Sequence, residues 1–181
     1  LTKNSNKRKF INLNIKKNMG KGYALKSGVK VAKNNWILTA DIDLSVKLEQ
    51  IIVWEKKYLQ EECFVYFGSR SHDLSNVKKN ILRNILGNIF KVLNYFLFDL
   101  NIKDTQCGFK LYKNIIAKNL FENLSQFGYI HDVEIAYKCS IKNLKIIELP
   151  VVWVHKSGGK INLFIDPIKM IFDLIKLKFR H

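Results

Sequence analysis

The spacing of hydrophobic and polar residues predicts alternating strands and helices. Phe10 to Ile15 alternates apolar and polar residues, as a half-buried strand does, whereas Trp36 to Ala40 and Cys63 to Gly68 are short apolar runs typical of buried strands. Tyr23 to Lys33 places its apolar residues on one helical face and its lysines on another. This alternation of strand and helix indicates an α/β fold.

The second half of the chain continues the alternation. Further helices are predicted at 47–60, 76–98, 114–123, 132–141 and 161–180, and further strands within 104–112 and 145–154. Pro150 lies inside the last of these strands, which indicates an edge strand or the start of a strand, because proline has no N–H to donate. The chain has no repeat, low-complexity segment or linker, so we expect one domain over residues 1–181.

Two of the predicted helices, near 76–98 and 161–180, combine a broad apolar face with Lys and Arg. Helices that lie in a membrane interface have this pattern, and so do helices that pack on a core. A membrane-spanning helix needs about 18 consecutive apolar residues, and the longest apolar region, 81–100, is interrupted by residues such as Arg83 and Lys91. We therefore predict no membrane span.

The chain is strongly basic. It has 31 Lys and Arg against 15 Asp and Glu, a formal net charge of +16, which favours an anionic partner such as a nucleotide, a nucleic acid or an anionic membrane surface. Its three cysteines, Cys63, Cys107 and Cys139, are far apart in the sequence. Their odd number and spacing fit neither a disulfide framework nor a zinc site and indicate a reducing compartment.

Two short motifs could bind a metal or a phosphate. Asp41 and Asp43 follow a buried strand, and carboxylates at i and i+2 project the same way and can share one divalent cation, although two acids can also simply begin a loop or cap a helix. The turn at 18–22 (NMGKG) carries Lys21 and leads into a helix, whose free N–H groups favour phosphate. It lacks the spacing of a Walker loop, so an ordinary turn is the alternative.

Later loops carry further polar candidates. Arg70 follows a strand, where a guanidinium can bind phosphate at two points or simply be solvated. The segment 104–110 (DTQCGFK) puts polar groups at a strand end, the usual ligand side of an open α/β sheet, and turn formation is the competing explanation. In 131–134 (HDVE), Asp132 is interpreted as a helix N-cap. His72 and His155 have no partner at ligand spacing and are interpreted as surface residues.

The order of these motifs is more specific than any one of them. NMGKGYALKSG, WILTADIDL, GSRSH, DTQCGFKLY, HDVEIAY and ELPVVWVHKSGGK follow one another in an order that resembles the polyprenyl-phosphate sugar transferases of glycosyltransferase family 2, in particular the dolichyl-phosphate β-glucosyltransferase branch. The resemblance extends from about Phe10 to Arg180. It implies a GT-A fold, the Rossmann-like fold of nucleotide-diphospho-sugar transferases.

The resemblance also implies an activity. It is the inverting transfer of glucose from UDP-glucose to dolichyl or polyprenyl phosphate, with Mg²⁺ or Mn²⁺, on the cytoplasmic face of a membrane. Another sugar nucleotide such as GDP-mannose remains an alternative, as does a catalytically inactive basic module that binds a membrane or nucleic acid. Nucleic acid is not expected, because the sequence has no helix-turn-helix, RRM or zinc-finger pattern.

The resemblance assigns roles to eight residues. These are Asp41 and Asp43 for metal and donor, Lys21 and Gln106 for donor, Asp43, Arg70 and Asp104 for catalysis, and Arg70, Arg83 and Lys160 for the acceptor phosphate. The chain departs from the family pattern at Gly159, where the family has Ser, and at His131, where it usually has an aromatic residue.

The family domain begins with two strand-helix units that bind the nucleotide base, and these have no counterpart before Phe10. At about 30 residues per unit, about 60 residues of the family domain are expected to be missing. We therefore expect this chain to be the C-terminal two thirds of the domain, or one product of a split gene. On this hypothesis it needs a separate N-terminal segment to bind UDP-sugar well.

Overall fold

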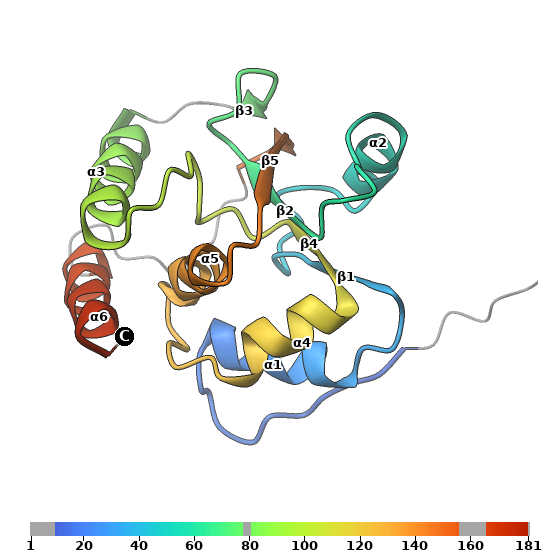
Figure 1. The fold of residues 1–181 in the computed structure, drawn as a ribbon, viewed down its shortest axis with the longest axis horizontal. Helices are drawn as coiled ribbons and strands as arrows, with labels where there is room; N and C mark the ends of the chain where they lie inside the picture. Colours follow the sequence, from blue (N-terminus) through green and yellow to red (C-terminus); the bar gives the residue numbers. More distant parts are fainter. Residues whose placement is uncertain (1–9, 78–80, 156–165, 181) are drawn as a thin grey trace, which may run out of the picture.

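A computed structural model describes residues 10–77, 81–155 and 166–180, with only the backbone described at 81–86. The chain forms an α/β domain, as the sequence predicts (Figure 1). Its elements, in chain order, are α1 (Lys21–Val31), β1 (Trp36–Thr39), α2 (Gln50–Lys57), β2 (Val65–Ser69), β3 (Asn76–Val77), α3 (Ile81–Phe98), β4 (Lys110–Lys113), α4 (Asn114–Glu122), α5 (His131–Ile141), β5 (Ile146–Pro150), β6 (Val152–Trp153) and α6 (Asp166–Arg180).

Four strands form the central sheet in the order β1-β4-β2-β5. β4 is antiparallel to both of its neighbours, and β2 is parallel to β5. β1, β2 and β5 therefore run in one direction, and their C-terminal ends lie at the edge of the sheet where the chain enters β4. Thr39 and Phe67, on either side, are both in register with Lys110 at this end.

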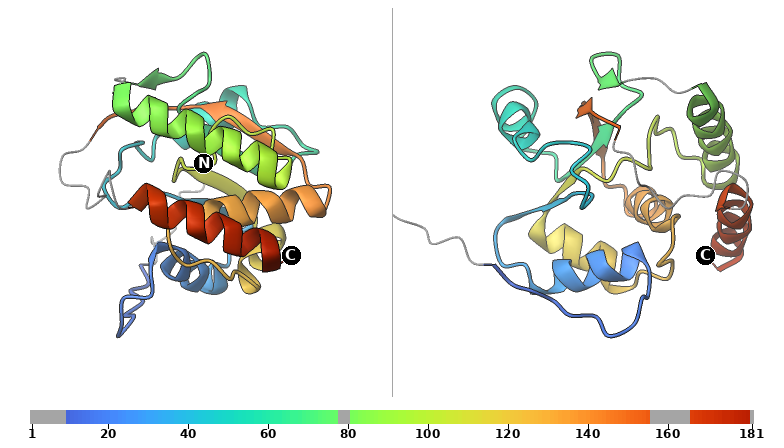
Figure 2. Two further views of the ribbon diagram at one scale, coloured as in Figure 1. Left: turned by 90° about the vertical axis from the view of Figure 1, so that its left-hand side faces the viewer. Right: turned by 180° about the vertical axis from the view of Figure 1, so that it is seen from behind.

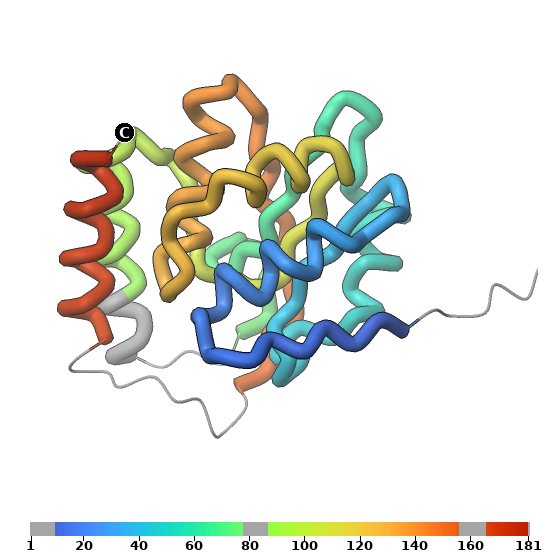
Figure 3. Tube along the Cα trace, turned by 90° about the horizontal axis from the view of Figure 1, so that it is seen from below, coloured from blue at the N-terminus to red at the C-terminus, as the bar shows by residue number. Residues whose placement is uncertain are grey.

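The sheet separates two hydrophobic cores because successive strand residues point to opposite faces. In β2, Val65 and Phe67 pack into one core and Tyr66 into the other. α1, α4 and α5 cover the first face, whereas α2 covers the second with the fully buried Trp54 (Figures 1 and 3). The sheet edge between these layers is left open for polar loops.

α3 and α6 pack against each other at one side of the molecule (Figure 2). α6 anchors itself in the first core with Leu174 and Leu177. The two helices also expose large apolar side chains, which we call the outer apolar face: Ile89, Val92, Tyr95, Phe96, Ile168, Phe172, Ile175 and Phe179. Among the described helices, none has both the length and the hydropathy that a membrane crossing requires.

The strand predicted at Phe10 to Ile15 is wrong. This segment forms no strand, and the side chain of Phe10 is 90% exposed. Alternating residues favour a strand only where a neighbouring strand supplies hydrogen bonds, and no described strand pairs with this segment.

Two predicted boundaries also change. Residues 76–77, predicted as the start of the long helix, instead form β3, because the Asn76 amide donates to the Val151 carbonyl and β3 pairs with β6. The strand predicted at 145–154 divides into β5 and β6. Pro150 ends β5 at the edge of the sheet, which confirms the edge position.

Candidate active site

Polar side chains from four loops meet at the C-terminal ends of β1 and β2. Asp41 follows β1, Arg70 follows β2, and the loop 104–109 enters β4 between them. Lys21 is the first residue of α1, after the predicted turn. Ligands of open α/β sheets bind outside the carboxyl ends of the strands, and these loops lie at that edge.

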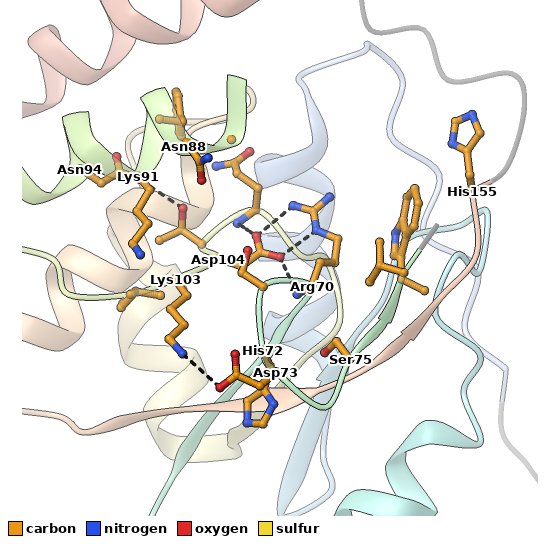
Figure 4. A pocket seen from close by; sticks show the side chains of 18 residues that line it. Arg70, His72, Asp73, Ser75, Asn88, Lys91, Asn94, Lys103, Asp104 and His155 are labelled. Carbon is orange, nitrogen blue, oxygen red and sulfur yellow. Dashed lines mark hydrogen bonds and ion pairs between the residues drawn. The ribbon is translucent and has the colours of Figure 1, made fainter. Parts of the chain in front are cut away.

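Arg70 and Asp104 are joined by two side-chain hydrogen bonds and one backbone hydrogen bond (Figure 4). The guanidinium Nε and Nη2 of Arg70 donate to Oδ2 and Oδ1 of Asp104 at 2.7 and 2.9 Å, and the Arg70 amide donates to Oδ2 at 2.9 Å. Oδ1 also accepts from the amides of Gln106 and Cys107, at 3.0 and 3.2 Å. Asp104 thus holds both Arg70 and the loop that carries Gln106.

This pairing keeps Asp104 ionised. Burial on its own would raise the pKa of Asp104, but the charge and hydrogen bonds of Arg70 outweigh it and hold the pKa below its usual value. The pKa of Arg70 is raised because Asp104 outweighs the opposing effect of burial. Both oxygens of this carboxylate already accept hydrogen bonds, and its pKa is low, so it is a poor proton acceptor. Asp104 therefore serves to position Arg70 rather than to act as a base.

Asp41 lies against the loop that enters β4. A Cβ atom added at Gly108 would be 2.4 Å from the carboxyl atoms of Asp41, so the carboxylate occupies the space that a side chain at 108 would need. The ammonium of Lys21 pairs with Asp41 Oδ1 at 2.5 Å. The predicted phosphate-binding lysine and the predicted metal ligand are therefore in direct contact.

Asp43 lies in the turn that follows β1. It is exposed, its Oδ1 accepts from the Ser45 amide at 2.9 Å, and the Leu44 amide closes the turn on the Asp41 carbonyl. Two carboxylates fit Mg²⁺ or Mn²⁺, because such ions are usually held by one or two carboxylates and by substrate phosphates. Among the described residues, no set of three or more His, Cys, Asp or Glu side chains forms a metal site.

A buried ion pair lies behind Lys21. The ammonium of Lys110 in β4 pairs with Oδ1 of Asp132 in the first turn of α5, and both side chains are almost fully buried. Asp132 therefore lies within the helix and is not its N-cap, contrary to the prediction; the N-cap is Ile130.

Burial alone would lower the pKa of Lys21, but Asp132 and Asp41 outweigh it, so this pKa is raised. Lys21 is thus held as a cation between two acidic groups.

A cavity of about 770 Å³ opens beside the Arg70–Asp104 pair, between α3 and the loops after β2 and before β4 (Figure 4). The polar residues that line it include Arg70, His72, Asn88, Lys91, Asn94, Lys103, Asp104, Gln106 and His155. A second cavity, of about 20 Å³, lies beside Asp41 and shares Arg70 with the first. Arg70 therefore stands at the boundary between the two.

The structure brings together five of the eight predicted residues. Lys21 contacts Asp41, and Arg70 contacts Asp104 beside Gln106, whereas Asp43 lies in the exposed turn. Lys160 lies outside the described residues. The side chain of Arg83 lies outside them as well, although its backbone belongs to α3.

Sequence reasoning missed several residues that line the cavity. Lys91 and Asn94 belong to the predicted helix but were not recognised, although the i, i+3 spacing of Asn88, Lys91 and Asn94 marks a polar stripe on its apolar surface. His72 and His155 line the cavity as well; His155 is exposed, as its interpretation as a surface residue predicts, and His72 is half-buried.

Comparison with known proteins finds relatives along almost the whole chain. The chain is 33% identical over 175 residues to the dolichyl-phosphate β-glucosyltransferase of Dictyostelium discoideum. The aligned region covers 93% of this chain and 54% of that protein. The chain is 32% identical to the Saccharomyces cerevisiae enzyme of that name (97% and 57% covered) and 31% to the Homo sapiens one (93% and 54%). The resemblance inferred from the motifs is confirmed. The chain spans about half the length of the curated relatives it matches.

Solved structures show the same fold. The glucosyl-3-phosphoglycerate synthase of Mycobacterium tuberculosis, solved in complex with uridine diphosphate, superposes with a TM-score of 0.60 at 13% identity, covering 88% of this chain and 55% of that one. This likeness confirms the predicted GT-A fold. No protein-family model matches the chain.

Proposed function

We propose that this chain carries the catalytic site of a glucosyltransferase that transfers glucose from UDP-glucose to dolichyl phosphate. The observation that carries the proposal is the meeting of Asp41, Lys21, Arg70 and Asp104 at one sheet edge, beside a cavity of about 770 Å³. The names of the relatives support the acceptor and the sugar. The uridine diphosphate in the structural neighbour supports the nucleotide of the donor.

Asp41, Asp43 and Lys21 form the donor side of this proposal. Asp41 and Asp43 would hold Mg²⁺ or Mn²⁺, which supplies positive charge to the diphosphate leaving group. Lys21 stays protonated because Asp41 and Asp132 raise its pKa, and it adds a second positive charge at this end of the site. Gln106, on the loop fixed by Asp104, would contact the sugar.

The acceptor needs no strong general base. A phosphate monoester is already an anion at neutral pH, so its oxygen can attack the anomeric carbon while the bond from that carbon to UDP breaks and UDP leaves with the electron pair. One in-line displacement inverts the configuration and yields a β-linked product. The N–H groups of Arg70 that Asp104 does not use point to binding of the acceptor anion.

The test is incubation of the chain, together with the N-terminal segment expected to complete UDP-sugar binding, with labelled UDP-glucose, dolichyl phosphate and Mn²⁺, followed by extraction of a chloroform-soluble labelled product. Omission of dolichyl phosphate and addition of a chelator are both expected to remove the product. GDP-mannose in place of UDP-glucose is expected to give none. A labelled lipid from GDP-mannose alone would contradict the choice of donor.

We further propose that the outer apolar face lies on the cytoplasmic surface of the membrane that holds the acceptor. Four exposed apolar residues, Ile168, Phe172, Ile175 and Phe179, belong to α6, which packs against α3 and its own exposed apolar residues. The net charge of +16 favours anionic lipid.

Flotation with anionic liposomes at low salt tests this surface. Phe172→Ser is expected to weaken flotation, whereas Ile115→Ser, which changes an equally exposed apolar residue on α4, is expected to leave it unchanged. A chain that stays in the soluble fraction would contradict the membrane assignment.

A further inference from the structure

The cationic side chains that line the large cavity differ in whether a carboxylate already pairs with them. Arg70 gives two of its N–H groups to Asp104, and the ammonium of Lys103 lies 3.9 Å from Asp73. Lys91 has no carboxylate partner among the side chains that the structure describes. It is therefore the cavity cation whose charge is most available to a ligand.

The helix geometry directs Lys91 into the cavity. Gly87, Lys91 and Asn94 follow one another at helical spacing and all line it, and Figure 4 shows Lys91 extending from α3 into this space. A Cβ atom at Gly87 would meet nothing within 4 Å, so the wall is open beside the lysine. The exposed apolar residues Val92 and Phe96 lie on another side of the helix.

The cavity lies on the side of Arg70 away from Asp41 and Lys21, and of the predicted donor residues Gln106 lines it. Asp41 lines the small cavity and not the large one, and neither Lys21 nor Asp43 lines the large one. An anion bound by Lys91 would therefore not be the diphosphate that Asp41 and Lys21 face. It would approach the site from the side of α3, the helix that carries half of the outer apolar face.

We infer that Lys91 binds the phosphate group of a phosphate-monoester acceptor in the large cavity, opposite Arg70. This inference rests on the proposed function for the class of ligand. It adds Lys91 to the acceptor site, and none of the sequence motifs contains this residue. Lys91 lines the cavity because of the side that α3 turns toward the loops, which the motifs do not reveal. An ammonium suits this place, since its three donors can follow a phosphate as it moves during the reaction.

Calorimetry with the full 181-residue chain tests the inference, with farnesyl monophosphate as the probe. Lys91→Ala is expected to raise the dissociation constant for farnesyl monophosphate about tenfold, the effect of losing one charge-assisted hydrogen bond, and to leave that for UDP unchanged. Lys91→Arg should retain most of the affinity. Lys118→Ala, which removes an exposed lysine from α4, is the matched control and should bind like the wild type.

A second pair of variants tests the cavity itself. Gly87→Phe is expected to block farnesyl monophosphate, because the new ring enters open space beside Lys91. Gly28→Phe is the control, because a Cβ atom at this α1 glycine also meets nothing within 4 Å and Gly28 does not line the cavity. Circular dichroism confirms that each variant is folded.

The outcomes separate the inference from the proposed function. Unchanged binding of farnesyl monophosphate by Lys91→Ala, or an equal loss of UDP, would overturn the inference. Inorganic phosphate bound as tightly as farnesyl monophosphate would assign the site to free phosphate and overturn the lipid acceptor. Lys91-dependent binding in a chain that transfers no glucose even when the N-terminal segment is supplied would support the inference and contradict the proposed function.

Discussion

The guanidinium of Arg70 and the carboxylate of Asp104 face each other edge to edge, with two parallel hydrogen bonds of 2.7 and 2.9 Å. The two residues are far apart in the sequence, one after β2 and one before β4. Their contact fixes the guanidinium in one orientation, because a two-point contact leaves it no rotation about the axis of the pair. This pair therefore ties the loop before β4 to the loop after β2.

Arg70→Ala is expected to destabilise the protein, because it leaves the buried carboxylate of Asp104 without its charge partner. A loss of about 3 kcal/mol in the free energy of unfolding is typical for breaking such a pair. Asp104→Asn in the same chain should recover part of this loss, since the unpaired charge is then gone. Urea unfolding of both single variants and the double variant measures the coupling, and additive losses would show that the two side chains do not interact.

A comparable loss in the free energy of unfolding is expected when the buried ion pair of Lys110 and Asp132 is broken. Lys110→Met keeps the volume of a side chain that is 1% exposed but leaves Asp132 unpaired, which should cost about 3 kcal/mol. Lys113→Met, in the same strand, removes a lysine that has no carboxylate partner among the described residues and should cost less than about 1 kcal/mol. Equal losses in urea unfolding would contradict the importance of the Lys110–Asp132 pair.

Acid is expected to destabilise the protein through His131. Burial lowers the pKa of this imidazole from its usual 6.5, so the unfolded chain binds a proton at a higher pH than the folded chain does. The stability that the neutral imidazole contributes is complete above about pH 6.5 and is lost as the pH falls toward the folded-state pKa.

Urea unfolding of the wild type at pH 7.5 and pH 5.5 should therefore show a decrease toward acid of at most about 1.4 kcal/mol per pH unit from this residue. His131→Phe should make the decrease smaller. The exposed His155 provides the control, and His155→Phe should leave the slope as it is in the wild type. A slope unaffected by His131→Phe would exclude this residue as its cause.

Asp43→Asn is expected to abolish metal-dependent transfer while leaving the fold intact. The amide oxygen of Asn can still accept from the Ser45 amide, so the turn is retained and the free energy of unfolding should change by less than about 0.5 kcal/mol. Binding of Mn²⁺, measured by electron paramagnetic resonance, should fall together with turnover. Glu61→Gln removes an equal charge from an exposed loop and should change neither quantity. Turnover close to that of the wild type in Asp43→Asn would refute the metal assignment.

The sequence was sufficient to predict the residues that follow the buried strands. Runs such as 36–40 and 63–68 are short and apolar, as buried strands are; Asp41 lies directly after the first run, and Arg70 follows the second after Ser69. The topology then brings these residues to one edge without further information. The contact between Lys21 and Asp41 could not be predicted in this way, because it depends on how α1 is placed by its packing against α4.

The residues that line the large cavity could not be predicted from hydrophobic periodicity alone. Lys91 lies in a helix with apolar residues on most sides, and only the packing of α3 against α6 determines which polar residue faces the loops. Phe10 to Ile15 shows the opposite error, since its alternation is regular but no described strand offers it hydrogen bonds. The local pattern of apolar residues predicts a helix or strand well only where the groups that pair with it are also close in the sequence.

Position 108 limits how this site could change through mutation. The Asp41 carboxylate fills the space beside Gly108, so any residue with a Cβ would push the acid away from the loop or the loop away from the sheet. A chain that diverges in sequence can exchange the cavity residues of α3 one at a time, but it can replace this glycine only if Asp41 is replaced in the same lineage. Loss of glycine at this position in a related chain would therefore be an early sign that the carboxylate at position 41 is no longer under selection.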